Sequence, residues 1–283
     1  MARDTNFYYS FLVLPAEQRR AIVAVWDFCR AVDDAVDEAV GVGLSREASA
    51  REEIGRWRRE LCACFDEGTP QTPQGLALVP CIERFELPRD PFQALIDGVE
   101  MDLGGRRYDT FAELYEYCIR VASAVGLICL HIFGSRDPRA RQYAIDLGVA
   151  LQLTNILRDV PADLAQGRVY IPLEDLRAHH CSEDDLRNES AQAGHGVRSL
   201  AVKALLRQQG ARARDYYERA ARALPRSDVR RLVAAEIMGA IYRALLHRIE
   251  RADFDVFSTR IRVPRPKRAL IAATIWARVA LFS

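Results

Sequence analysis

Polar side chains recur every four residues in the stretch 151–172, which reads LQLTNILRDVPADLAQGRVYIP. Asn155, Asp159 and Asp163 are spaced so that they share one face of a helix. The apolar residues around them are typical of a buried helix, so this face is predicted to point inward. Buried carboxylates are costly unless cations or a solvated cavity lie beside them.

A second acidic stretch, 26–38, reads WDFCRAVDDAVDE and places Asp33 and Asp37 four residues apart. A lone pattern of this kind is equally compatible with a solvated acidic patch. Here it continues an apolar helical run, which favours an inward face. Clusters of oxygen donors suit hard divalent ions, and Mg²⁺ commonly bridges carboxylates to substrate phosphates. Two such faces together predict a magnesium–diphosphate site.

The composition limits the class of protein. The chain has 283 residues, 49% of them hydrophobic, which is enough for one large core. A net charge of +1 and the lack of a basic block argue against a general nucleic-acid binder. Seven cysteines without a CxxC pair predict reduced thiols, and the start MARDTNFYYSF lacks the apolar core of a signal peptide. We therefore expect a cytoplasmic protein.

Helical periodicity dominates the chain, and no alternating β pattern of useful length occurs. The fold class is therefore predicted as all-α, with a single domain spanning 1–283. Helices are expected over 15–40, 45–65, 74–85, 90–103, 111–133, 138–164, 198–223, 227–252 and 265–281, with a shorter one from Leu173. The polar segment 182–196 is predicted to be a mobile loop.

Three segments have further implications. Gly126, in the middle of the helix expected over 111–133, predicts close approach of another helix or of a long ligand. Charged residues in that helix argue against a membrane span. The C-terminal segment 265–283 is either the last core helix, which we favour, or a helix at a membrane surface. The aromatic residues of 6–11 either pack in the core or line an apolar channel.

Three strings resemble the squalene/phytoene synthase family: CRAVDDAVDE (29–38), YCIRVASAVG (117–126) and the stretch 151–172. The resemblance covers nearly the whole chain. Within the family, FYYSF, DGVEMDL and RVASAVGL look most like the bacterial branch that forms presqualene diphosphate for hopanoid biosynthesis. The resemblance implies an isoprenoid-synthase-type helical bundle with a central cavity.

The resemblance also implies a prenyltransferase that condenses two molecules of farnesyl diphosphate head to head (1′-1) to presqualene diphosphate. Two or three Mg²⁺ ions per active site are implied, without NADPH. The implied partners are a downstream hopanoid-pathway enzyme and the inner face of the membrane, met peripherally, but no nucleic acid. Three alternatives stay open: an NADPH-dependent squalene synthase, a phytoene synthase using geranylgeranyl diphosphate, and a non-catalytic scaffold.

The implied roles fall on residues that match the family's motifs. The metal ligands are Asp33, Asp37, Asn155, Asp159 and Asp163, and the four aspartates are catalytic together with Tyr117. The diphosphate-binding residues are Arg30, Arg158 and Arg168. The substrate channel is assigned to Phe7, Phe11, Val121, Val125, Leu151 and Tyr242.

Two positions depart from the family's pattern. Pro161 stands where the family often has glycine, and proline disfavours helix at the preceding residue. This weakens the case for Asp163 as a ligand. Thr5-Asn6 stands where relatives often have serine or lysine near the second diphosphate, so the contacts to that diphosphate stay open.

Overall fold

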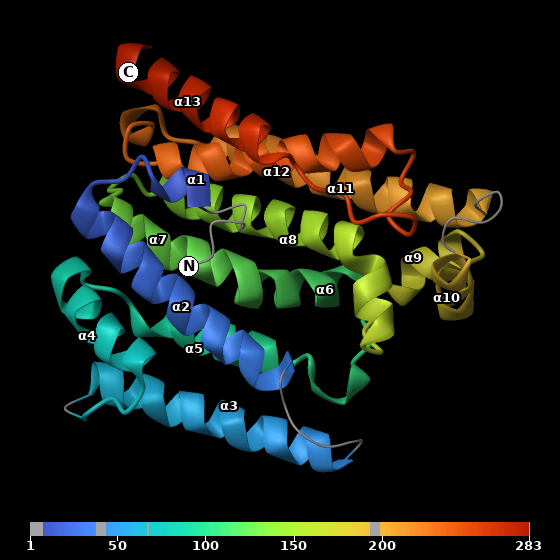
Figure 1. Cartoon of the computed structure of the whole chain (residues 1–283), viewed down its shortest axis with the longest axis horizontal. Coiled ribbons are helices and arrows are strands. Elements are labelled where there is room, and N and C mark those ends of the chain that lie inside the picture. Colours follow the sequence, from blue (N-terminus) through green and yellow to red (C-terminus); the bar gives the residue numbers. More distant parts are fainter. Residues whose placement is uncertain (1–7, 38–43, 67, 193–198, 283) are drawn as a thin grey trace.

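A computed structural model describes residues 8–37, 44–66, 68–192 and 199–282, and every regular element in these ranges is helical (Figure 1). The elements are α1 (Tyr8–Phe11), α2 (Ala16–Asp37), α3 (Leu44–Phe65), α4 (Pro73–Phe85), α5 (Arg89–Glu100), η1 (Leu103–Gly105), α6 (Phe111–Cys118), η2 (Ile119–Ser123), α7 (Ala124–Phe133), α8 (Arg139–Ala165), α9 (Leu173–Ala178), α10 (Glu183–Ala191), α11 (Leu200–Ala223), η3 (Arg226–Asp228), α12 (Val233–Arg251) and α13 (Arg265–Phe282). The all-α prediction is confirmed.

The helices that carry the acidic residues end on the same side of the bundle. In Figure 1 the C-terminal ends of α2, α5 and α8 all lie toward the right-hand side. α7 packs against α2, α5 and α8, while α11 packs along α8 and α12 contacts both α1 and α13. This topology brings residues that are far apart in the chain to one end of the molecule.

Aromatic side chains fasten α2 to its neighbours. The ring of Phe28 meets Trp57 of α3 and Phe92 of α5 edge to face, with centroids 5.4 and 5.8 Å apart. All three rings are buried. Such pairs contribute about 0.5–1.5 kcal/mol each beyond the burial of their area. Because Asp33 follows Phe28 on the same helix, this packing fixes the direction in which the acidic face points.

The long apolar helix in the middle of the chain contains a π-helical turn, η2, between α6 and α7. A methyl group on Gly148 of α8 would lie 2.6 Å from the Cα of Ser123 in this turn. A Cβ on Gly126 would lie 3.1 Å from the carbonyl oxygen of Ala144, also in α8. The predicted close approach of a helix at Gly126 is therefore confirmed. π-Helical turns are often found at functional sites.

The segment 182–196 was predicted to be a loop, and that prediction was wrong for its described part. Residues 183–191 form α10, which begins with a capping box between Ser182 and Asp185. The side chain of each bonds the backbone N–H of the other, so two otherwise unpaired donors are satisfied. The Ser-x-x-Asp spacing is typical of such a cap and could have predicted that a helix begins here.

Two apolar helical segments differ in how much of their surface packs against other helices. The 23-residue segment Phe111–Phe133 is long and apolar enough to cross a membrane, yet its parts pack against α5 and α8. α13 buries Ala272 and Val279 against α12. Large apolar side chains elsewhere on its surface are exposed, namely Leu270, Trp276 and Leu281. The interpretation of the C-terminal segment as a core helix therefore holds for one face only.

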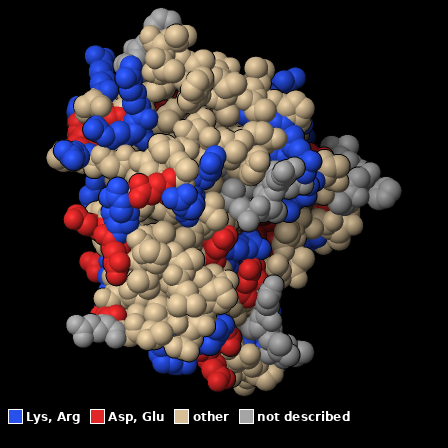
Figure 2. All heavy atoms as spheres, turned by 60° about the vertical axis from the view of Figure 1, so that its left-hand side comes forward, with Lys and Arg blue, Asp and Glu red and all other residues tan. Residues whose placement is uncertain are grey.

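Charged side chains of both signs are interspersed on the face shown in Figure 2, between broad areas of neutral side chains. Arg58 donates to both Asp97 and Glu100 at 2.6 Å. Each of these three side chains is about a third to a half exposed. Ion pairs this accessible contribute roughly 0–1 kcal/mol.

Candidate active site

The two acidic stretches meet through an arginine. Arg168 follows α8 in a segment that turns at Gly167, whose φ of 76° suits glycine. The guanidinium Nη2 of Arg168 donates to Oδ1 of Asp37 at 2.7 Å. This hydrogen bond joins the exit of α8 to the last residue of α2. The two acidic stretches were predicted to face each other, and that arrangement needs such proximity.

The second acidic stretch lies on one continuous helix. α8 runs through Pro161 to Ala165, so the expected local break does not occur. Proline removes one helical hydrogen bond, but the rest of α8 is held by packing against its neighbours. Asp159 and Asp163 keep their helical spacing, and the objection to Asp163 no longer holds.

Two of the carboxyl groups are difficult to ionise in the folded protein. Burial raises the pKa of Asp33 to about 6, and the negative charges of Asp37 and Asp102 add to the effect. Asp33 is nevertheless an exposed residue, so its carboxyl is crowded by neighbouring atoms without being enclosed. Burial and the charge of Asp159 raise the pKa of Asp163 to about 7. Both groups are therefore poised to bind positive charge.

Asp159 is held by two arginines. Arg158 Nε donates to its Oδ1 at 2.9 Å, and Nη2 of Arg260 lies 3.1 Å from the same oxygen. Arg158 is also hydrogen-bonded to the buried Tyr242, which was assigned to the substrate channel. Arg260 precedes α13 and was not predicted, because no motif around it distinguishes it from other arginines in the sequence.

Asn155 contributes an oxygen that lacks a partner. Its Oδ1 is buried and accepts no hydrogen bond from the part of the chain that the structure describes. Among the described residues, no three His, Cys, Asp or Glu side chains are close enough to hold a metal by themselves. Mg²⁺ does not need such a cage, because it is commonly held by one or two carboxylates and substrate phosphates. The oxygen donors present fit that mode of binding.

A carboxylate joins two buried tyrosines beside the acidic residues. Asp102, in the turn after α5, accepts hydrogen bonds from the hydroxyls of Tyr170 at 2.7 Å and Tyr117 at 3.0 Å. The two rings stack with centroids 5.1 Å apart, and Tyr108 packs beside them. Burial raises the pKa of both hydrogen-bonded tyrosines, so both stay protonated. Tyr117 was predicted, whereas neither Asp102 nor Tyr170 was among the predicted site residues.

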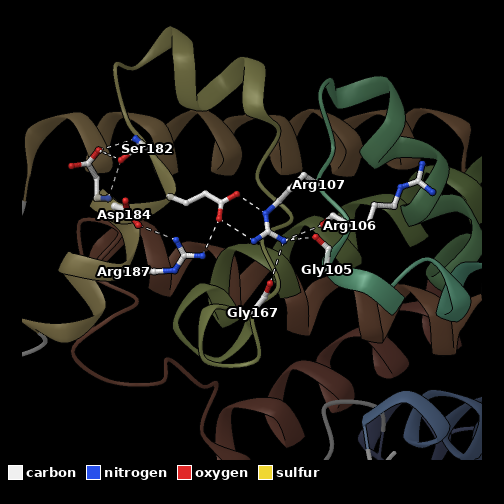
Figure 3. Close-up of polar contacts among 9 residues, drawn as sticks. Gly105, Arg106, Arg107, Gly167, Ser182, Asp184 and Arg187 are labelled. Carbon is white, nitrogen blue, oxygen red and sulfur yellow. Dashed lines mark hydrogen bonds and ion pairs between the residues drawn. The ribbon is translucent and has the colours of Figure 1, made fainter. Parts of the chain in front are cut away.

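Arg107 anchors the loop that leads to Arg168 (Figure 3). Its guanidinium donates to the carbonyl oxygens of Gly105 at 2.7 Å and Gly167 at 3.2 Å. It also donates to both carboxylate oxygens of Glu183, the first residue of α10. One side chain thus ties together the turn after α5, the exit of α8 and α10.

The other predicted residues occupy several environments. Arg30 forms an ion pair with Asp34 at 3.0 Å and lines a surface hollow between α2 and α4, so its role toward a diphosphate stays a prediction. Phe11 is buried in the core. The remaining channel residues in the described range are partly accessible and pack against the core: Val121, Val125 and Leu151. Phe7 lies outside the described residues.

Comparison with known proteins agrees with this arrangement. The family model for squalene/phytoene synthase matches residues 1–267. A 15-cis-phytoene synthase from Synechocystis sp. is 39% identical over 288 residues, covering 96% of this chain and 81% of the relative. A phytoene synthase from Mycobacterium tuberculosis is 34% identical over 274 residues, covering 96% of this chain and 86% of the relative.

Two solved structures share the fold. The squalene synthase HpnC from Alicyclobacillus acidocaldarius has a TM-score of 0.75 and 30% identity, covering 88% of this chain and 89% of its own. A dehydrosqualene synthase in complex with a ligand has a TM-score of 0.84 and 24% identity, covering 99% of this chain and 93% of its own. Since the family model spans nearly the whole chain, the protein is an enzyme of the squalene/phytoene synthase family.

Proposed function

We propose that this enzyme condenses two molecules of farnesyl diphosphate head to head, giving presqualene diphosphate and diphosphate. The observation that carries the proposal is the meeting of two acidic helix faces at the contact between Asp37 and Arg168. The strings FYYSF, DGVEMDL and RVASAVGL favour farnesyl diphosphate as the substrate and presqualene diphosphate as the product.

In the proposed reaction, the bond between C1 and the diphosphate oxygen of one substrate breaks, and the diphosphate leaves with the electron pair. The C1 cation then bonds to the C2–C3 double bond of the second substrate, which keeps its diphosphate. Loss of a proton from the former cationic carbon closes a cyclopropane ring. The proton acceptor is the released diphosphate or a water at Tyr117.

The residues around the leaving group have complementary charges. Magnesium, when bound, would neutralise the leaving diphosphate as a Lewis acid, and its proposed ligands are Asp33, Asp37, Asn155, Asp159 and Asp163. Three guanidinium groups are placed to donate charge-assisted hydrogen bonds to diphosphate oxygens, namely Arg158, Arg168 and Arg260. Carboxylates that bind these arginines in the free protein would turn to the metal when the diphosphate takes their place.

The carbocation must be kept from water and close to the second double bond. We assign this role to the partly accessible side chains of Val121, Val125 and Leu151, which lie on η2, α7 and α8. The Tyr117 hydroxyl lies beside the acidic residues, where its oxygen is available to the cation. An apolar wall with oriented oxygen suits a reaction that ends in carbon–carbon bond formation.

A second candidate is phytoene synthesis from two molecules of geranylgeranyl diphosphate. It is favoured by the names of the curated relatives described above, both of which are phytoene synthases. The test is to incubate the purified protein and Mg²⁺ with farnesyl or geranylgeranyl diphosphate, each with and without NADPH. Ionic and neutral products are then analysed by mass spectrometry.

A C30 diphosphate formed equally with and without NADPH would support the proposal. Squalene formed only with NADPH would reassign the protein as a complete squalene synthase, and a preference for the C20 substrate would make it a phytoene synthase. Asp159→Asn should be inactive on every substrate, with Asp184→Asn on α10 as the matched control. Absence of turnover on both substrates would favour a scaffold.

We also propose that the enzyme works at the inner face of the membrane and passes its product to a downstream enzyme of hopanoid synthesis. The product would be strongly apolar apart from its diphosphate. The exposed side chains of α13 offer a surface for this contact: Leu270, Trp276 and Leu281, with the cations Lys267 and Arg278 nearby. Apolar residues with flanking cations are typical of helices that lie at anionic bilayers.

A further inference from the structure

Asp102 is a partly buried charge-bearing group that the proposed chemistry has not yet used. It comes from the turn after α5, Tyr117 comes from α6 and Tyr170 from the exit of α8. Each oxygen of its carboxylate accepts one tyrosine hydroxyl, at 2.7 and 3.0 Å. Three separate elements therefore meet at one carboxylate next to the acidic residues.

The hydrogen-bonding capacity of these groups fixes where the protons lie. An ionised carboxylate only accepts, and each phenol has a single proton to donate. Both phenolic protons are therefore committed to Asp102, since the two hydroxyl oxygens are 3.3 Å apart and make the longer contact. Burial raises the pKa of Asp102, and the two tyrosine hydrogen bonds and the positive charge of Arg168 oppose that rise. Each phenolic oxygen has then used its only proton, and only its lone pairs remain to contact another group.

A carbocation has specific needs in its surroundings. It is stabilised by nearby negative charge, yet a bare carboxylate in contact with it would form a covalent ester. A phenolic oxygen whose proton is held by a carboxylate is more electron-rich than a free phenol and remains a weak nucleophile. Such preorganised dipoles are effective because they need no rearrangement during the reaction.

We propose that Asp102 is a positioning residue that holds the Tyr117 and Tyr170 hydroxyls with their lone pairs directed away from it, toward the reacting carbon atoms. The proposal rests on the proposed function, since it requires a carbocation. The surroundings support a fixed geometry. Tyr108 packs against both rings, and the turn that carries Asp102 is held through Gly105 by Arg107.

The test is a double-mutant cycle with Asp102→Asn and Tyr117→Phe, assayed on the prenyl diphosphate that the wild type turns over. An asparagine keeps the shape but accepts with one atom only, so one phenol must reorient. We expect kcat to fall roughly 10- to 100-fold, as is usual when a supporting partner is lost, with KM and the Mg²⁺ requirement within about twofold. The share of prenyl alcohol, formed when water captures the cation, should rise.

The double variant should be slower than Tyr117→Phe by a smaller factor than Asp102→Asn costs in the wild type, because Asp102 acts partly through the Tyr117 hydroxyl and partly through that of Tyr170. Fully additive losses, an unchanged kcat in Asp102→Asn, or a selective rise in the Mg²⁺ requirement would each overturn the proposal. Circular dichroism and thermal unfolding of every variant identify loss of fold, and Asp102→Glu, which retains the charge, should recover part of kcat. If the wild type makes no head-to-head product at all, the proposed function fails instead.

Discussion

At the scale of single residues, Asp163 shows how a binding site lowers the stability of the free protein. Such a carboxyl ordinarily ionises near 3.8, whereas in the fold the pKa of Asp163 is about 7. Between these values the folded state holds a proton that the unfolded state has lost, so this group makes stability fall as pH rises. Above pH 7 the folded protein bears the full free-energy cost of ionising Asp163, and this cost is offset only when positive charge binds.

Asp163→Asn should therefore stabilise the metal-free protein while removing activity. We expect Tm to rise by roughly 2–4 °C at pH 8, the shift typical of 1 kcal/mol in a chain of this size. The gain should shrink toward zero by about pH 3, where the wild-type carboxyl is largely protonated in both states. Thermal unfolding at the two pH values measures this, with the exposed Asp184→Asn as control. A gain that is equal at both pH values would contradict the assignment.

The raised pKa of Asp163 also makes magnesium binding depend on pH, because a ligand carboxyl must lose its proton. Titrating Mg²⁺ in the presence of inorganic diphosphate, in buffers of different ionisation enthalpy, gives the number of protons released. At pH 6.5 the wild type should release about one proton more than Asp163→Asn, and at pH 9 the difference should vanish. An equal release at both pH values would show that Asp163 is not a ligand.

At the scale of elements, the close contact of α8 with the π-helical turn positions the helix that carries Tyr117. Gly148→Ala would place a methyl group 2.6 Å from the Cα of Ser123, and backbone cannot move aside cheaply. We expect a loss of about 1–3 kcal/mol in urea unfolding, the usual cost of overpacking. Gly55→Ala on α3 is the control, since its nearest neighbour is the flexible end of Arg59 at 3.6 Å. A neutral Gly148→Ala would mean that the turn adjusts freely.

Arg107 offers a second prediction at this scale. Arg107→Ala would free the carbonyls of Gly105 and Gly167 and so displace Arg168. We expect kcat/KM to fall roughly 100-fold, mostly because KM rises, since misplacement of a binding group by about 1 Å can have an effect of this size. Glu183→Gln keeps the contacts of Arg107 to both carbonyls and should cost far less. Equal losses in the two variants would show that the ion pair, rather than the loop, matters.

The sequence was sufficient for most helices and for the two acidic stretches, because four-residue spacing and apolar periodicity are local signals. It failed where the outcome depends on distant contacts. Pro161 was expected to disturb α8, yet packing keeps the helix continuous. Arg260 carries no motif of its own, and the string DGVEMDL, which contains Asp102, gives that residue no role; only the fold brings the two to Asp159 and Tyr117. The cap of α10 was visible locally and was overlooked.

At the scale of the whole molecule, the polar site and the exposed apolar helix are adjacent in the chain. Arg260 contacts Asp159, and α13 begins five residues later, at Arg265. The outer face of α13 exposes Leu270 and Leu281, which are 67% and 75% accessible. A membrane contact through α13 would therefore lie close in sequence to a diphosphate-binding arginine, and it would give an apolar product a short route to lipid.

This arrangement predicts binding to anionic vesicles through α13. Phosphatidylglycerol vesicles should sediment the wild type, and phosphatidylcholine vesicles should bind it more weakly. Each of Lys267→Glu and Arg278→Glu should weaken binding at least fivefold, since one basic residue contributes about 1 kcal/mol at an anionic surface. The pair Leu270→Glu and Leu281→Glu should abolish it, whereas Leu76→Glu, at an exposed leucine of α4, should not. If the α13 variants sediment like the wild type, contact with lipid is made elsewhere, because an apolar face cannot enter a bilayer with two added carboxylates.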